Sequence, residues 1–256
     1  MTDPLARFSN RTENYVKYRP GYPSEILKIL KSDCGLQETS VVADVGSGTG
    51  ILCEMLLKNG NTVFAVEPNA AMRLTAEDLR KKYGKFNSID AAAEASTLAT
   101  ASVDFVTAAQ AFHWFDRQKA KAEFARILKP GGWVVLIWNE RRLDSTPFLR
   151  AYEELLLRYG TDYQQVRHEN VTDEIEEFFA PETFELKTLQ NVQHFDFNSL
   201  KGRLLSSSYA PNQDRPNFNP MLSELGKIFN ANQRAGIVNF EYKTKVYYGR
   251  LAEVGT

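Results

Sequence analysis

The sequence predicts an α/β protein built on a doubly wound, mostly parallel sheet. Over residues 41–138, short β-branched or apolar runs alternate with amphipathic helical stretches, which is the pattern of successive βαβ units. A glycine-rich segment, residues 44–50, lies where the first run passes into the first helix. Turns at this position bind ligands in doubly wound sheets.

Each element follows from a local pattern. We expect strands at 41–45, 61–66, 86–89, 103–108 and 133–138. A helix follows Gly50 and stops at Gly60, and a second begins at the N-cap Asn69 and ends at Gly84. A third begins at the N-cap Asp116 and ends in the Lys-Pro-Gly-Gly segment 129–132.

The pattern changes after Asn139. Thr146-Pro147 opens a helix, and residues 172–179 predict another. Two β-like stretches, 184–197 and 241–251, flank a polar, partly helical segment, 198–239. We therefore expect a single domain over 1–256, with an N-terminal lid and helix at 1–40, a cofactor-binding core at 41–139, a helical insertion at 140–182, and last strands at 183–256 that include an acceptor-site segment, 198–239.

Composition limits the partners. The chain has 256 residues, 43% hydrophobic and 25% charged, which is typical of a globular protein. Its formal charge of −1 offers no general attraction for nucleic acid or anionic lipid. We expect no nucleic-acid partner, no membrane partner, and a monomer or homodimer.

Cysteine usage and the N-terminus indicate the compartment. The two cysteines, Cys34 and Cys53, show no metal-ligand spacing and no disulfide framework, so we expect no metal and a reducing environment. The first residues lack a signal-peptide pattern, and the longest apolar run, 133–138, is far shorter than a membrane span. These features predict a cytoplasmic protein.

Glycine spacing decides which nucleotide the turn suits. A dinucleotide fingerprint needs glycine at position 51, where the chain has Ile51, and the third glycine comes one residue early, at Gly50. Glu67 ends the second predicted strand at about the 20-residue offset from which an acid reaches an adenosine ribose. An NAD-dependent oxidoreductase stays an alternative, which the misplaced glycine disfavours.

Five segments together resemble a known family: VADVGSGTG at 42–50, EPN at 67–69, RILKPGG at 126–132, YVKYRPGYP at 15–23 and AQAFHWF at 109–115. They are similar to class I S-adenosylmethionine-dependent methyltransferases, in particular the methyltransferase type 11 group with trans-aconitate-type enzymes. The resemblance implies a Rossmann-like, doubly wound, mostly parallel seven-stranded sheet with an antiparallel last strand, plus helical insertions that form a cap. It implies S-adenosylmethionine as the cofactor.

The resemblance also implies roles for residues at the carboxyl ends of the strands. The methionine part of the cofactor is expected among Asp44, Gly46, Ser47 and Gly48, with Gln110 near the sulfonium. Glu67 would hold the ribose, Pro68 and Met72 would flank the adenine, and Ala93-Glu94 would bind the adenine edge, for which Asp90 competes. In the N-terminal segment, Tyr15 and Arg19 would close over the cofactor, with Arg19 pairing with its carboxylate.

Methyl transfer from a sulfonium needs an aimed nucleophile and exclusion of water rather than a nucleophilic side chain. His113 is the candidate general base; the alternative is that it is a hydrogen-bonded member of the aromatic cluster 112–115, which would shape the pocket wall. The candidate acceptor contacts are Trp114, Tyr209 and Arg142. The adjacent pair Arg141-Arg142 could clamp an anionic acceptor, although both are also consistent with solvated loop charges. We expect a methyltransferase acting on a small organic molecule, with a carboxylic acid favoured; a non-catalytic cofactor-binding protein is a further alternative.

Overall fold

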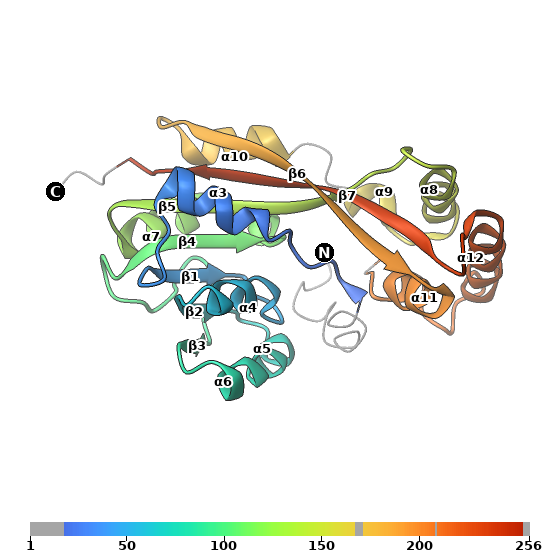
Figure 1. Ribbon diagram of the computed structural model, residues 1–256, viewed down its shortest axis with the longest axis horizontal. Helices are drawn as coiled ribbons and strands as arrows, with labels where there is room; N and C mark the ends of the chain where they lie inside the picture. Colours follow the sequence, from blue (N-terminus) through green and yellow to red (C-terminus); the bar gives the residue numbers. More distant parts are fainter. Residues whose placement is uncertain (1–17, 167–170, 208, 253–256) are drawn as a thin grey trace. The chain divides into compact units, whose positions relative to one another are not determined.

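The computed structural model describes residues 18–166, 171–207 and 209–252, and seven strands of this part form one sheet in the order β3-β2-β1-β4-β5-β7-β6 (Figure 1). Tyr15 lies outside the described residues. The strands are β1 (Val41–Val45), β2 (Thr62–Val66), β3 (Phe86–Ile89), β4 (Val103–Ala109), β5 (Leu128–Arg141), β6 (Phe184–Phe195) and β7 (Val238–Gly249).

The strand directions match the predicted fold class. β3, β2, β1, β4 and β5 pair in parallel. Between β5 and β7, Arg142 N donates to Glu241 O, and Thr244 Oγ1 donates to Asn139 Oδ1. Residue numbers therefore increase along β5 in the direction in which they decrease along β7, so β7 is antiparallel to β5. A mostly parallel seven-stranded sheet with an antiparallel last strand is confirmed.

The helices begin where capping residues predict. Asn69 accepts hydrogen bonds from the backbone N–H of Ala71 and Met72, Asp116 from Lys119 N, and Thr146 from Leu149 N. The helices are α3 (Glu25–Cys34), α4 (Ile51–Lys58), α5 (Ala70–Ala76), α6 (Asp78–Lys82), η1 (Phe112–Trp114), α7 (Arg117–Ile127), α8 (Pro147–Tyr159), α9 (Tyr163–Val166), α10 (Val171–Phe179), α11 (Phe197–Leu205) and α12 (Phe218–Asn232).

Several boundaries differ from the sequence prediction. β6 ends at Phe195 rather than at residue 197, and β7 spans Val238–Gly249 rather than 241–251. The helix expected after Asn69 is two helices, α5 and α6, which break at Glu77 while Met72, Ala76 and Leu79 stay buried. β5 begins at Leu128 rather than at residue 133. Leu128 already pairs with Val103 of β4, and the register shifts across the Pro-Gly-Gly turn before pairing resumes at residue 133.

Chain contacts divide the protein into two compact units. Unit 1 comprises 1–20, 140–169 and 190–243, and unit 2 comprises 21–139, 170–189 and 244–256. The expected helical insertion, 140–182, is thus shared between the units, with α8 and α9 in unit 1 and α10 in unit 2. The boundaries also fall inside β5, β6 and β7.

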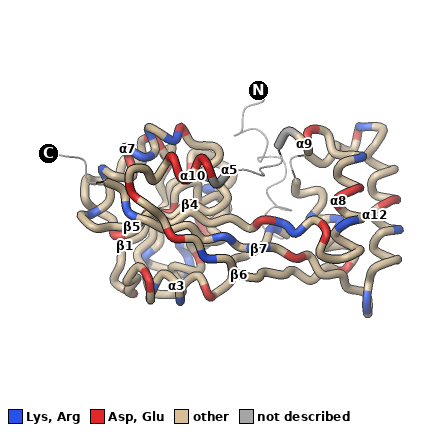
Figure 2. The backbone as a smooth tube through the Cα atoms, turned by 90° about the horizontal axis from the view of Figure 1, so that it is seen from above, with Lys and Arg blue, Asp and Glu red and all other residues tan. Residues whose placement is uncertain are grey.

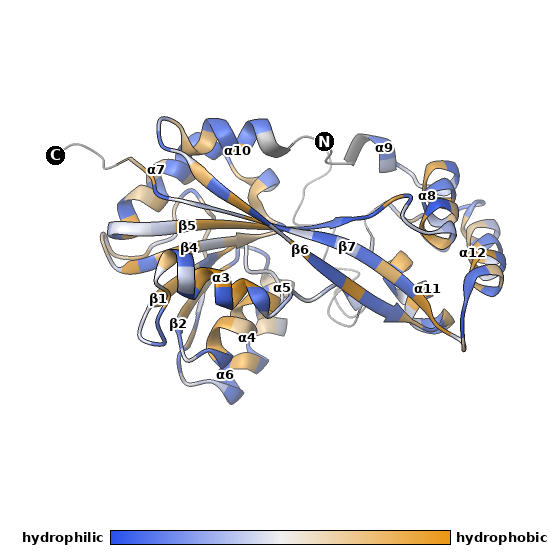
Figure 3. Cartoon of the chain, turned by 45° about the horizontal axis from the view of Figure 1, so that its top comes forward, coloured by the Kyte–Doolittle hydropathy of each residue, from blue (hydrophilic) through white to orange (hydrophobic). Residues whose placement is uncertain are grey.

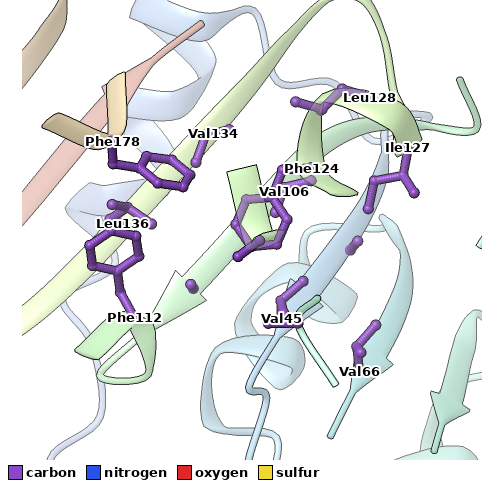
Figure 4. Close-up of a cluster of buried hydrophobic side chains, with 14 of the residues drawn as sticks. Val45, Val66, Val106, Phe112, Phe124, Ile127, Leu128, Val134, Leu136 and Phe178 are labelled. Atoms are coloured by element: carbon purple, nitrogen blue, oxygen red, sulfur yellow. The ribbon is translucent and has the colours of Figure 1, made fainter. Parts of the chain in front are cut away.

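Unit 2 buries both faces of its parallel strands, as doubly wound sheets do. On one face, Val134 and Leu136 of β5 pack with Phe124 of α7 and Phe178 of α10 (Figure 4). Arg117 of α7 also pairs at 3.2 Å with Glu174, one of the acidic residues of α10 (Figure 2). The alternate residues of β5, 135 and 137, face a second cluster with α3 and α4.

The edge strand contrasts with this interior. In β6, single hydrophobic residues are separated by hydrophilic ones and most of the strand is exposed, whereas hydrophobic residues run along the middle of β5 (Figure 3). Unit 1 has its own core, in which α8, α11 and α12 pack through Tyr152, Leu200 and Leu225 with Phe240 of β7. Within the described residues, no helix combines the length and apolar character needed to cross a membrane.

One buried amide fixes the entry to the first two strands. Asn61 is fully buried, and its Nδ2 donates to Gln37 O at 2.7 Å and to Ser40 O at 2.9 Å. We predict that Asn61→Leu lowers the free energy of unfolding by about 2–4 kcal/mol, because both carbonyls lose this donor in a dry site. Asn87→Leu is the matched control, since its bonds are longer, at 3.3 and 3.4 Å. Equal losses in urea unfolding of the two variants would contradict this assignment.

Candidate functional site

The turn after β1 folds as its glycines require. Gly46, Gly48 and Gly50 have φ of +66°, +57° and +84°, a region that residues with a Cβ rarely adopt. A Cβ on Gly46 would lie 2.5 Å from Ala111 Cβ, and one on Gly50 would lie 2.6 Å from Leu79 Cδ1. These two glycines permit close packing, whereas a Cβ on Gly48 would meet only Met72 Sδ, at 3.7 Å.

Glu67, at the end of β2, holds this turn. Its Oε2 accepts from Gly48 N at 2.9 Å, and its Oε1 accepts from Asn69 N at 2.8 Å. The side chain is buried, and burial raises the pKa of its carboxyl, although the bonds from Asn69 and Gly48 oppose the rise. A carboxylate has about four acceptor positions, so about two remain for hydroxyl donors.

Asp44 is tied into the interior instead. Its Oδ1 accepts from Thr107 Oγ1 at 2.8 Å and its Oδ2 from Cys53 Sγ at 3.1 Å. Burial, together with the charge of Glu67, raises the pKa of Asp44 to about 6, although these two hydrogen bonds oppose the rise. Asp44 therefore anchors the base of the turn to β4 and α4.

The adenine-side candidates lie along the next loops. Met72 is buried at the start of α5, and Pro68 is exposed. Ala93 is buried, and Glu94 Oε1 accepts from Asp116 N at 2.7 Å. The competing residue Asp90 is exposed and paired at 2.6 Å with Arg73, so its carboxylate is already engaged.

Gln110, directly after β4, has a strained backbone. Its φ is +56°, a conformation that costs a non-glycine residue of order 1–3 kcal/mol and that clusters at functional sites. Its Nε2 donates to Asn139 O at 3.3 Å. Within the described chain, its Oε1 is buried without a hydrogen-bond partner, as are Ser47 Oγ and Thr49 Oγ1.

His113 and Trp114 follow on η1. Phe112 anchors this short helix in the core, where its ring packs at 4.9 Å against Phe178. The His113 ring lies 4.7 Å from the Trp114 ring and 6.0 Å from the Trp138 ring. Trp114 is 43% exposed, so the helix turns Phe112 inward and Trp114 toward solvent.

The remaining candidates belong to unit 1. Arg19 Nη2 donates to Ser206 O, which follows α11, at 3.3 Å. Arg142 pairs at 3.4 Å with Glu241. Tyr209 is partly buried, and its ring stacks edge-on at 4.9 Å with Tyr163. The predicted residues thus form two groups, one in each unit.

Comparison with known proteins identifies the family. A methyltransferase domain model of type 11 matches residues 43–136. An uncharacterized methyltransferase-like protein of Schizosaccharomyces pombe is 33% identical over 62% of this chain and 60% of its own. An uncharacterized methyltransferase of a Geobacillus species is 30% identical over 59% of this chain and 73% of its own. The chain belongs to the class I S-adenosylmethionine-dependent methyltransferases.

Solved structures agree on the fold. A putative type II methyltransferase from Anaeromyxobacter dehalogenans superposes with a TM-score of 0.69 over 91% of this chain and 98% of its own, at 22% identity. This chain spans about three fifths of the length of the first relatives that it matches. The match to the trans-aconitate-type subgroup stays a prediction.

The turn fits the S-adenosylmethionine of this methyltransferase family on three observations. Glu67 keeps acceptor positions for ribose hydroxyls, Gly48 leaves the space of a side chain open, and the buried oxygens of Ser47, Thr49 and Gln110 have no partner in the described residues. A polar ligand bound against the turn would fill the space at Gly48 and would supply hydrogen-bond partners for Glu67 and for these buried oxygens.

Sequence reasoning missed several residues that shape this methyltransferase site. Thr107 and Cys53 hold Asp44, and Glu123 accepts from Ser96 N at 2.8 Å, which fixes the loop after Glu94. None belongs to a motif, because each acts through a fold-dependent contact. In the sequence, only Cys53 could have drawn attention, as a cysteine in the predicted helix after the turn. The structure shows that this cysteine is free and buried.

The raised pKa of Asp44 gives a pH prediction. Its carboxyl ionises near 3.8 when unfolded and near 6 when folded, so the unfolded state loses the proton first as pH rises through this window. Wild-type stability relative to Asp44→Asn should therefore fall by about 2 kcal/mol between about pH 4 and pH 7. Urea unfolding at both pH values measures this difference. Asp214→Asn, at an exposed loop carboxylate, is the control; parallel pH curves for wild type and Asp44→Asn would refute the assignment.

Proposed function

We propose that this protein transfers the methyl group of S-adenosylmethionine to a small organic molecule, with a carboxylic acid favoured as acceptor. The observation that carries the proposal is the Glu67 carboxylate, which organises the glycine-rich turn and keeps acceptor positions for two hydroxyls. Family membership supplies the cofactor, whose sulfonium provides an activated methyl group when bound.

In this proposal, different residues of unit 2 bind different parts of S-adenosylmethionine. Glu67 holds the ribose, Met72 and Pro68 flank the adenine, and the amides of Gly46, Ser47 and Gly48 line the methionine part. Gln110 contributes its partnerless Oε1 beside Asn139, where it suits the amino group of the cofactor. Asp44 acts through the turn, because both of its oxygens already accept hydrogen bonds.

The acceptor assignment rests on charge and chemistry. A formal charge of −1 favours small molecules over nucleic acid. A carboxylate acceptor is ionised at neutral pH and needs no base, whereas hydroxyl or amine acceptors would assign His113 the role of general base. In this proposal Trp114, Arg142 and Tyr209 contact the acceptor, while Tyr15 and Arg19 close over the cofactor.

The proposal extends to domain organisation and oligomeric state. We propose a single domain over 1–256 that acts as a monomer or homodimer. It would include an N-terminal lid at 1–40 and an acceptor-site segment at 198–239. Two free, buried cysteines suit the reducing cytoplasm that we propose as its location.

Substitution of Gly48 tests most directly whether the glycine-rich turn after β1 binds the cofactor. We predict that Gly48→Val abolishes binding of S-adenosylhomocysteine in calorimetry while the protein stays folded, because the new side chain fills the space beside Met72 Sδ. Gly131→Val is the matched control, since Gly131 has φ +74° and nothing within 4 Å of its Cβ position. It carries the same backbone strain away from the turn and should bind normally.

Turnover then separates the alternatives. Wild type should form S-adenosylhomocysteine from S-adenosylmethionine with at least one member of a panel of carboxylic acids, and Gly48→Val should not. Binding without turnover across acids, phenols and amines would favour a non-catalytic protein. Thermal stabilisation by NAD and not by S-adenosylhomocysteine would favour an oxidoreductase and reject the proposal.

A further inference from the structure

Unit 1 buries two guanidinium groups around one phenylalanine ring. Arg141, the last residue of β5, has a side chain only 10% exposed, and Arg203 of α11 is 6% exposed. The Arg141 Cζ lies 5.9 Å and the Arg203 Cζ 5.5 Å from the centroid of Phe240. Both charges therefore occupy one small, aromatic region of this unit.

Only Arg141 of these two arginines pairs with a carboxylate among the described residues. Glu153 of α8 accepts from Arg141 Nη2, and Tyr163 Oη completes this contact by donating to Glu153 Oε2 at 2.6 Å. Among the described residues, no carboxylate lies within salt-bridge distance of Arg203. Its hydrogen bonds go to neutral hydroxyls, Ser207 Oγ at 3.1 Å and Tyr242 Oη at 3.4 Å. Within the part of the chain that the structure describes, the cluster thus holds one buried positive charge without a counter-ion.

Unused donors accompany this charge. In the described part of the chain, Arg141 Nη1 is buried without a hydrogen-bond partner, and so is the hydroxyl of Tyr152. Arg141 stacks over the Tyr152 ring at 5.4 Å, and that ring lies 5.0 Å from Phe240. Buried donors in native proteins are nearly always satisfied, so these groups indicate a missing acceptor.

The positive charges of the buried arginines also affect the pKa of Tyr209. Burial raises the pKa of Tyr209, but the charges of Arg203, Arg141 and Arg19 lower it by more, so its pKa is lowered overall. Tyr209 therefore stands within electrostatic reach of both buried guanidinium groups. A buried cation that lacks its partner destabilises the folded chain, and such residues persist where they serve binding.

We propose that Arg203 and Arg141, with the hydroxyl of Tyr152, bind a carboxylate group of the methyl acceptor. Planar guanidinium forks match the two oxygens of a carboxylate. The proposal rests on the proposed methyltransferase function for the identity of the ligand, and it adds acceptor-binding residues to Arg142, whose charge is also paired with Glu241.

Binding of simple carboxylates tests the site without turnover. The probes are succinate, citrate and benzoate at constant ionic strength, with succinamide and benzamide as uncharged analogues and inorganic phosphate as a competing anion. We expect concentration-dependent thermal stabilisation of the whole wild-type chain by at least one carboxylate and not by its amide. No stabilisation by any carboxylate, or stabilisation by phosphate alone, would overturn the proposal.

Substitution of Arg203 separates a binding role from a structural one. Arg203→Met should leave the melting temperature of the free protein unchanged or raised, because it removes an unpaired buried charge, and should weaken carboxylate binding at least about tenfold. Arg158→Gln is the matched control, since Arg158 is an exposed arginine of the same unit that also stacks on a ring, Tyr159 at 5.3 Å. Undiminished carboxylate binding by Arg203→Met would overturn the proposal.

Two further readouts complete the design. If Arg203→Met does not fold, Arg203→Lys keeps the charge without the fork and should still weaken binding; equal binding would contradict the proposal. Affinity for S-adenosylhomocysteine should not change, and a tenfold loss would assign these arginines to the cofactor carboxylate instead. If wild type binds carboxylates through Arg203 yet methylates nothing, the anion site stands and the methyltransferase proposal fails.

Discussion

The site in unit 2 depends on one carboxylate. Glu67 accepts hydrogen bonds from Gly48 N and Asn69 N, and so joins the turn after β1 to the start of α5. Val66 O, one residue earlier, accepts from Gly46 N and Ser47 N. The end of β2 therefore shapes a turn that lies more than 15 residues before it in sequence. Because the carboxylate is buried, its hydrogen bonds are stronger than they would be in water. Burial also disfavours its charged form and so raises its pKa. Ribose hydroxyls that donate to the carboxylate would offset part of this cost.

The two units bury charge of opposite sign. In unit 2, Asp44 and Glu67 lie close enough for the charge of Glu67 to raise the pKa of Asp44. In unit 1, Arg141 and Arg203 are both buried, and among the described residues only Arg141 pairs with a carboxylate, that of Glu153. An acidic cradle suits a sulfonium cofactor, and a basic cluster suits an anionic acceptor. In the proposed reaction a sulfonium and a carboxylate would give neutral products, so the transfer itself would need little acid or base chemistry.

Local signals explain which parts of this structure the sequence could predict. β1 and β3 follow their hydrophobic runs to the residue, and the helices begin at Asn69, Asp116 and Thr146 because those caps satisfy backbone donors locally. The glycine turn and Glu67 were predictable because their spacing is fixed by a β-α-β unit. The anchoring of Asp44 by Thr107, 63 residues away in sequence, was not, since it depends on strand pairing. The early start of β5 likewise depends on pairing with β4. In unit 1, sequence reasoning named the adjacent pair Arg141-Arg142, but a local pattern cannot tell that Arg141 is the buried one, paired with Glu153, while Arg142 pairs with Glu241 and is more exposed.

The most direct measurement of the central claim is the backbone amide spectrum of isotope-labelled protein during titration with S-adenosylhomocysteine. If the turn held by Glu67 is the cofactor cradle, the amide signals of Gly48 and Asn69 shift first and most, since both donate to the carboxylate that the ribose would engage. Those of Gly46 and Ser47 should move with the same dissociation constant. Saturable shifts confined to other residues, with Gly48 and Asn69 unmoved, would contradict the account.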